Sequence, residues 1–128
     1  MLKIDANIIL RYLLEDHTEF SPLARKTITE NTVEVPIEVL CEVVYVLTRT
    51  YRINRNEIAF TLLEFFQSPN IILPHREAVI EGIGYFGTTS LDFVDCILAG
   101  YAKVEKDEIY TFDNSLKKLI VRIGEGIL

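Results

Sequence analysis

The sequence predicts an α/β protein, a three-layer α/β/α sandwich in which a central, mainly parallel sheet of four to five short strands lies between helices. Short runs rich in β-branched residues alternate along the chain with longer runs of helical periodicity. Such alternation is typical of a parallel sheet covered on both faces. Because the 128 residues contain no internal repeat or Gly/Ser-rich linker, we expect a single domain over residues 1–128.

Five segments have the composition of a strand. Four are short apolar runs along the chain, and a fifth candidate follows a terminal helical turn. The expected strands are residues 2–5, 32–35, 71–73, 108–112 and 119–123.

Helices are expected between these strands, where capping residues precede apolar runs. Ser21 followed by Pro22 is a typical helix start, with serine as N-cap and proline at the first helical position. Asn54 is expected to cap a later helix, and Thr89 or Ser90 the last long one. The expected helices are residues 6–14, 22–29, 38–51, 55–67, 75–86 and a run ending at 104.

The composition excludes several classes of protein. Nineteen Asp and Glu against thirteen Lys and Arg give a net charge of −6, which by itself argues against tight binding to bare nucleic acid. Cys41 and Cys96 form no C-x-x-C pair, and His17 and His75 are the only histidines, so neither a zinc site nor a disulfide framework is predicted. The acidic start at Asp5 is unlike a signal peptide, and no run approaches the ~18 apolar residues of a membrane span. We expect a cytoplasmic protein without a membrane partner.

The segment from Gly82 to Gly87 matches the dinucleotide pattern G-x-G-x-x-G literally. That pattern binds a pyrophosphate where it follows a strand and opens a helix. Here the glycines end a run, residues 76–81, that is itself expected to be helical. We therefore interpret Gly87 as a helix C-cap and expect no nucleotide cofactor.

Four carboxylates stand in apolar surroundings, unlike the other acids of the chain. Asp5 ends the first expected strand, and Asp113 follows the fourth. Glu42 is the only charge within residues 39–47, and Asp95 is the only charge within residues 93–99. A carboxylate in apolar surroundings must be paired, protonated or bound to a cation, because burying it unpaired is costly.

The expected topology could bring these four acids together. The carboxyl ends of parallel strands share one edge of a sheet, and the following helices begin there. Four carboxylates at that edge would repel one another unless cations lay among them, and Mg²⁺ and Mn²⁺ prefer oxygen ligands. The pattern therefore predicts a divalent-metal site suited to phosphodiester hydrolysis.

Each acid also has a simpler interpretation. Asp5 and Asp113 could be helix N-caps, and Asp95 could merely complement the dipole of a helix. Asp92 lies on the same helical face as Asp95 and would occupy a capping-box position if Thr89 were the N-cap.

Four motifs surround these acids in order along the chain. Residues 4–14 open with a strand-ending Asp, a small residue and Asn, and residues 35–44 carry a helical Glu after Val-Pro. Residues 91–99 centre on Asp95, and in residues 111–113 a Thr stands two positions before an Asp. Over essentially the whole chain, this series resembles the PIN-domain family, and within it the VapC-type toxin ribonucleases.

The resemblance implies an endoribonuclease in which Asp5, Glu42, Asp95 and Asp113 are both the catalytic residues and the ligands of one or two Mg²⁺ or Mn²⁺ ions. Asn7 and Thr111 would support the site by hydrogen bonding, with Asp92 as a further supporting acid. Small departures from the family pattern at positions 6, 96 and 100 remove no metal ligand. The implied partners are an RNA substrate, a second copy in a homodimer and a cognate antitoxin.

Arginines supply candidates for RNA contact. Arg49, Arg52 and Arg55 lie with a tyrosine within seven residues, enough for phosphate contacts, although cations are also typical of a solvated helix C-terminus. Arg11 stands in apolar surroundings and is a fourth candidate; it or Arg49 could instead pair with Glu42.

Two other functions compete with the ribonuclease. A receiver-type phosphoacceptor domain needs an acidic pair just after the first strand, whereas Asp5 stands alone. A non-catalytic PIN scaffold that binds RNA or protein remains the alternative, and retention of all four acids argues against it.

Overall fold

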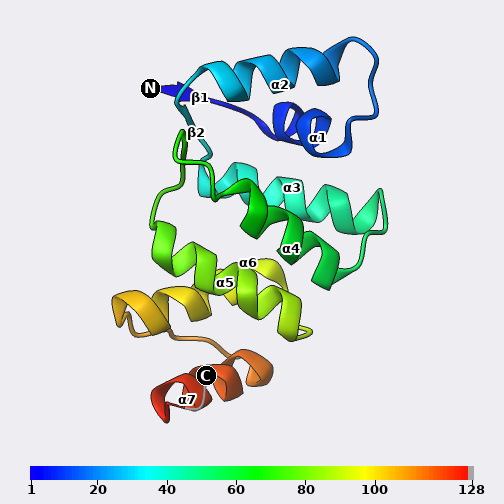
Figure 1. The fold of residues 1–128 in the computed structure, drawn as a ribbon. Helices are drawn as coiled ribbons and strands as arrows, with labels where there is room; N and C mark the ends of the chain where they lie inside the picture. The colour runs from blue at the N-terminus through cyan, green and yellow to red at the C-terminus, as the bar shows by residue number, and fades with distance from the viewer. Residues whose placement is uncertain (127–128) are drawn as a thin grey trace.

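The computed structural model describes residues 1–126, and within them three short strands form one parallel sheet. The strands are, in both chain and spatial order, β1 (Leu2–Lys3), β2 (Val33–Glu34) and β3 (Ile71–Ile72). In the central strand, Val33 lies opposite Leu2 on one side and Ile71 on the other. Helices flank this sheet, so the predicted α/β class is confirmed (Figure 1).

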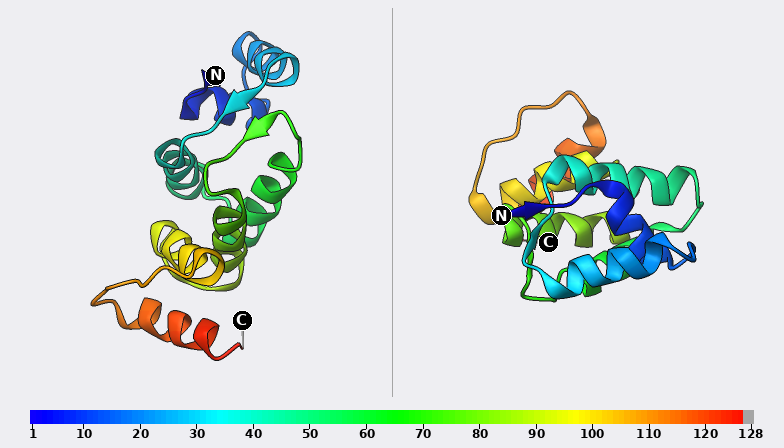
Figure 2. Two further views of the ribbon diagram at one scale, coloured as in Figure 1. Left: turned by 90° about the vertical axis from the view of Figure 1, so that its left-hand side faces the viewer. Right: turned by 90° about the horizontal axis from the view of Figure 1, so that it is seen from above.

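Most of the described residues are helical. The helices are α1 (Ala6–Leu14), α2 (Phe20–Glu30), α3 (Ile37–Arg49), α4 (Arg55–Phe65), α5 (Arg76–Thr88), α6 (Phe93–Gly100), the π-helical turn η1 (Tyr101–Glu105) and α7 (Asn114–Gly124). They stack in chain order, with α1, α2 and the strands at one end, α3 to α6 between, and α7 at the other end (Figures 1 and 2). None of the helices within residues 1–126 is long and apolar enough to cross a membrane.

One hydrophobic core runs through the molecule. Val33 of the sheet, Leu40 of α3, Leu62 of α4 and Ile83 of α5 are all completely buried. Leu116 of α7 belongs to the same cluster, so the last helix is anchored to the body by its own apolar side. Each such side chain contributes about 1.5–3 kcal/mol of hydrophobic stabilisation on burial.

Two expected helix starts have different outcomes. Asn54 caps α4 as predicted, because its side-chain oxygen accepts a hydrogen bond from the Glu57 N–H at 2.9 Å. By contrast, α2 begins at Phe20, before the expected Ser21–Pro22 start. The buried Ser21 hydroxyl accepts instead from the His17 N–H at 3.1 Å, and Pro22 lies in the first turn, where its missing N–H leaves no bond unmade.

The prediction of a fourth and a fifth strand is wrong for the described residues. Residues 108–112 have no regular structure and no strand partner, and Tyr110 and Phe112 are 87% and 81% exposed. Their rings contact each other at 5.4 Å instead of packing on the core. Residues 119–123 belong to α7, because burial of Leu116 and Leu119 with Ile120 and Ile123 packed beside them follows the helical period. β-Propensity without a neighbouring strand does not make a sheet.

The helix that carries Asp95 starts later than predicted. Thr89 ends α5, because its N–H and its hydroxyl both donate to the Tyr85 carbonyl, at 2.9 and 2.8 Å. The next helix, α6, begins at Phe93 with Asp92 as its N-cap residue. From Tyr101 the hydrogen bonding widens to the π-helical η1, so the expected α-helix to residue 104 is interrupted.

The glycines of the G-x-G-x-x-G segment lie inside α5, so Gly87 is not the predicted C-cap. Gly82 and Gly87 allow neighbouring helices to approach closely, whereas a Cβ built on Gly84 would meet nothing within 4 Å. A Cβ built on Gly82 would lie 2.8 Å from the Cys96 carbonyl oxygen of α6. Gly100 of α6 is tighter still, since its Cβ would lie 2.1 Å from the Ala78 carbonyl oxygen of α5. The pattern therefore serves helix packing and does not open a helix toward a phosphate.

Candidate active site

Asp95 lies in the first turn of α6, the helix that crosses α5 at its glycines. Phe93, Cys96 and Ile97 of the same helix are buried and fix its position, while Asp95 itself is partly buried at the surface. Asp95 is the one acid among apolar neighbours in this segment, and because those neighbours are buried, its carboxylate lies at the edge of the core.

The electrostatic environment of Asp95 is unfavourable to its charged form. Burial raises the pKa of the Asp95 carboxyl, and the negative charges of Asp113 and Asp92 raise it further. Asp113 and Asp92 are therefore close enough for their charges to act on Asp95. A site of this kind gains from a bound cation, which would relieve the repulsion.

Asp113 is the N-cap of α7. Its Oδ1 accepts a hydrogen bond from the Leu116 N–H at 2.8 Å, which confirms the capping interpretation. The Thr111 hydroxyl accepts from the Asp113 N–H at 3.0 Å. Thr111 thus orients the backbone at this acid.

Asp92 differs from the expected capping-box acid. It is the N-cap residue of α6 itself, it is exposed, and its side chain makes no capping hydrogen bond. Its carboxylate is therefore free of the local role that the sequence suggested, while its charge acts on Asp95.

Asp5 lies at the other end of the molecule, where it caps α1. Its Oδ1 accepts from the Ile8 N–H at 3.2 Å, so the capping interpretation holds here too. Asn7 is exposed in the first turn of the same helix. Because α1 and α7 lie at opposite ends of the stack, Asp5 and Asp113 are not brought together (Figures 1 and 2).

Glu42 is exposed on α3, although its sequence neighbours are apolar. The helical period places Leu40, Val43, Val44 and Leu47 in the core and turns Glu42 away from it. The alternative interpretation, an ion pair with Arg11 or Arg49, is not realised among the described residues. Arg11 pairs instead with Asp16 at 2.8 Å.

The four motif acids therefore do not form one cluster in this structure. Within residues 1–126, no three side chains of the His, Cys, Asp and Glu types are grouped so that they could hold a metal ion. The donor set has the carboxylate chemistry that Mg²⁺ and Mn²⁺ prefer, but this arrangement does not gather it. Among the described acids, Asp113 and Asp92 are the ones whose negative charges raise the pKa of Asp95.

Two of the four candidate RNA-contact arginines donate hydrogen bonds to other groups of the protein, and the other two are exposed to solvent. Arg11 donates to Asp16 and, at 3.1 Å, to the Tyr51 hydroxyl. Arg55 donates to the carbonyls of Phe86 and Leu91 and is thereby fixed between helices. Arg49 and Arg52 are exposed. The two exposed arginines are the better placed to meet a phosphate.

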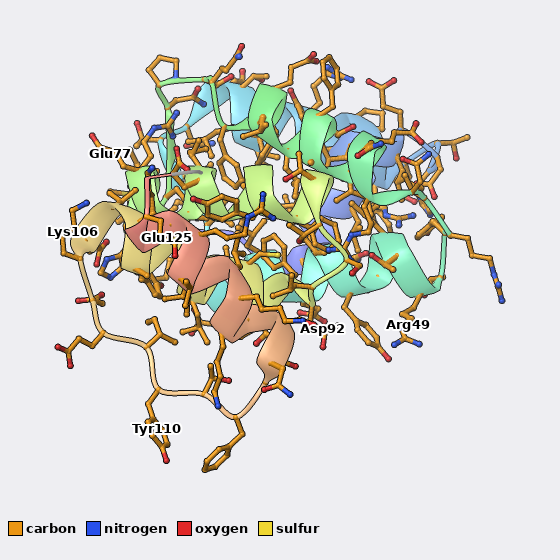
Figure 3. All side chains as sticks on the ribbon, turned by 90° about the horizontal axis from the view of Figure 1, so that it is seen from below. Arg49, Glu77, Asp92, Lys106, Tyr110 and Glu125 are labelled. Carbon is orange, nitrogen blue, oxygen red and sulfur yellow. The ribbon has the colours of Figure 1, made fainter. Side chains whose placement is uncertain are left out.

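Tyr45 is a residue that the sequence patterns did not single out. It is 63% exposed on α3, with the Arg49 guanidinium 5.8 Å from its ring centroid. The available signal was helical spacing, since Glu42, Tyr45 and Arg49 share one face at intervals of three and four residues. Figure 3 shows Arg49 and Asp92 on the same side of the molecule, and both line one pocket.

Comparison with known proteins gives one match. The sequence model described as PIN domain matches residues 3–120, a span that includes all four motif acids. No curated protein and no solved structure matches the chain.

Proposed function

This chain belongs to the PIN-domain family, and from that membership we propose that it is a Mg²⁺- or Mn²⁺-dependent endoribonuclease, the VapC-type toxin of a toxin–antitoxin pair. PIN domains are generally nucleases and typically use divalent metals. The observation that carries the proposal is Asp95, a partly buried carboxylate at the third family motif whose pKa is raised by burial and by the charges of Asp113 and Asp92.

The proposed ligands are Asp5, Glu42, Asp95 and Asp113. A divalent ion bound by carboxylates supplies an activated water and stabilises charge on a phosphate. In this chain, the buried side chains of α6 fix the helix that carries Asp95, and the N-cap bond to Leu116 holds Asp113 at the start of α7. Because no three of these side chains are grouped within residues 1–126, binding one metal through all four acids requires movement of the segments that carry them, including the segment before α7 that ends at Asp113.

The proposed partners follow from charge and chemistry. A net charge of −6 and an acidic group around Asp95 favour a basic segment of an antitoxin over a second acidic protein. We further propose a homodimer in the cytoplasm. Two free cysteines, with no disulfide among the described residues, fit a reducing compartment.

A second candidate function, the non-catalytic scaffold that binds RNA or protein, is favoured by one specific observation. No three potential ligands are grouped for a metal within residues 1–126. A scaffold would keep the PIN fold and its caps without requiring the acids to meet.

Cleavage of single-stranded RNA in Mg²⁺, in Mn²⁺ and in a chelator tests the two functions. We expect metal-dependent cutting by the wild type and none by Asp95→Asn, because the amide removes the central ligand. Glu64→Gln, an exposed acid outside the motifs, is the matched control and should cut normally. If a folded Asp95→Asn protein cuts RNA like the wild type, the assignment of Asp95 as a metal ligand of the ribonuclease is wrong.

Calorimetric titration with Mn²⁺ separates the enzyme from the scaffold without relying on the choice of RNA. The wild type should bind Mn²⁺ more tightly than a variant in which all four motif acids are replaced by their amides. Equal binding by the two proteins would support the scaffold.

A further inference from the structure

A pocket of about 300 Å³ lies where α3, the end of α5 and the start of α6 meet. Its lining includes Cys41, Tyr45 and Arg49 from α3 and Asp92 from the start of α6. Asp92 is one of the two acids whose charges raise the pKa of Asp95, so the pocket adjoins the candidate active site. The volume is at the lower end of the range of small-ligand sites, which suits one nucleotide better than a protein segment.

The outer wall of the pocket combines an exposed aromatic ring with an unpaired cation. Tyr45 is 63% exposed, and the Arg49 guanidinium lies 5.8 Å from its ring centroid. Among the described residues, Arg49 forms no ion pair with a carboxylate. Tyr45 and Arg49 lie on the same face of α3 as Glu42, so a carboxylate, an aromatic ring and a guanidinium follow one another along this helix.

The inner wall of the pocket is fixed. Arg55 lies over the Phe86 ring, with its guanidinium carbon 3.9 Å from the ring centroid. It also donates to the Phe86 carbonyl at 3.0 Å and to the Leu91 carbonyl. Phe93 meets Phe86 edge to face at 5.4 Å. Because these groups are already held in place, a ligand entering the pocket would not have to order them.

We propose that this pocket is a nucleotide subsite for the RNA substrate, in which one base packs against Tyr45 and the adjoining phosphate binds Arg49. The inference rests on the proposed ribonuclease function and adds the residues that position the strand. Unpaired bases stack on aromatic side chains, and arginine forms strong hydrogen bonds to phosphate. A base held beside Asp92 places the next part of the strand toward Asp95.

Binding of a fluorescently labelled single-stranded RNA, followed by anisotropy, tests the subsite without cleavage if every protein carries Asp95→Asn. Tyr45→Ala should weaken binding by at least about fivefold, the lower end of base stacking on an aromatic ring, whereas Tyr45→Phe should bind like its parent. Arg49→Ala should weaken binding and reduce its dependence on salt, because one phosphate contact is lost. Phe60→Ala and Lys26→Ala, an exposed aromatic and an exposed cation outside this pocket, are the matched controls.

Cys41 gives a second readout that does not involve activity. It lines the pocket and is partly buried, whereas Cys96 is completely buried. Alkylation of the Cys41 thiol by iodoacetamide therefore reports whether the pocket is open or occupied. Saturating 5′-nucleoside monophosphates should slow the alkylation of Cys41 severalfold in the wild type and much less in Tyr45→Ala.

The outcomes separate this inference from the function on which it rests. Wild-type cleavage of RNA together with unchanged RNA binding by Tyr45→Ala and Arg49→Ala would overturn the subsite and leave the ribonuclease intact. An equal loss of binding in the control variants would also overturn it. Absence of cleavage, together with weakened binding in the two pocket variants and protection of Cys41, would overturn the ribonuclease and support the subsite.

Discussion

Replacing Gly100 by alanine tests the crossing of α5 and α6, which positions Asp95. The new Cβ would lie 2.1 Å from the Ala78 carbonyl oxygen and 3.1 Å from the Gly82 nitrogen. Real Cβ atoms essentially never approach another heavy atom below 3.0 Å. The obstacle is the backbone of the first turn of α5, so no side chain can rotate away, and the two helices must separate by about 1 Å.

The cost follows from that separation. Overpacking of this kind costs about 1–3 kcal/mol or more, and a gap of about 1 Å forfeits a large part of the dispersion energy between the facing surfaces. Alanine offsets this by about 1 kcal/mol through its higher helix propensity. We therefore expect Gly100→Ala to lower the free energy of unfolding by about 2 kcal/mol, which for a chain of this size lowers Tm by roughly 6–10 °C.

Urea unfolding followed by circular dichroism at 222 nm measures this difference. Gly84→Ala is the matched control, because no atom lies within 4 Å of its built Cβ and it stands in α5 itself. That control should gain up to about 1 kcal/mol. If Gly100→Ala unfolds at the same urea concentration as the wild type or at a higher one, the close approach of α5 and α6 is refuted.

Three further predictions concern the acids and the exposed segment. Because the pKa of Asp95 is raised in the folded state, the wild type should lose stability relative to Asp95→Asn as pH rises above about 4, and thermal melts of the two proteins at several pH values should differ least below that pH. Asp113→Ala should be less stable than Asp113→Asn by about 1 kcal/mol, since the amide keeps the N-cap bond to Leu116; equal urea midpoints would contradict the capping role. Chymotrypsin should cut after Tyr110 or Phe112 in the metal-free protein, and Mn²⁺ should slow the cut if the segment moves to recruit Asp113; an unchanged rate in saturating Mn²⁺ would contradict that movement.

Local signals in the sequence predicted much of the fold. The three strands of the sheet lie within expected segments, and α1 matches its expected range of residues 6–14. The Asn54 cap was predicted from residue type alone, because the bond it makes reaches only to Glu57. Caps and helix periods are properties of a few neighbouring residues, so the sequence carries them directly.

The site was predictable in part. The sequence singled out Asp95, which is partly buried and whose pKa is raised, but the same apolar-neighbour criterion also selected Glu42, which is exposed. The criterion considers the hydrophobicity of all sequence neighbours around a full helix turn, whereas the burial of a side chain depends on the face of the helix that its residue occupies. Tyr45 was missed for the opposite reason, since an aromatic residue in an apolar helix is usually in the core.

The sequence by itself determined the family, the α/β class and the order of helices and strands up to α6, and it offered the capping roles that Asp5 and Asp113 have. Only the tertiary structure decided that residues 108–112 stand apart from the sheet, that Asp113 acts on Asp95 and not with Asp5, and that Tyr45 and Arg49 share a pocket with Asp92. The physical reason is range: a cap or a helical period is satisfied within one or two turns, whereas strand pairing and the repulsion between carboxylates depend on segments that only packing brings together.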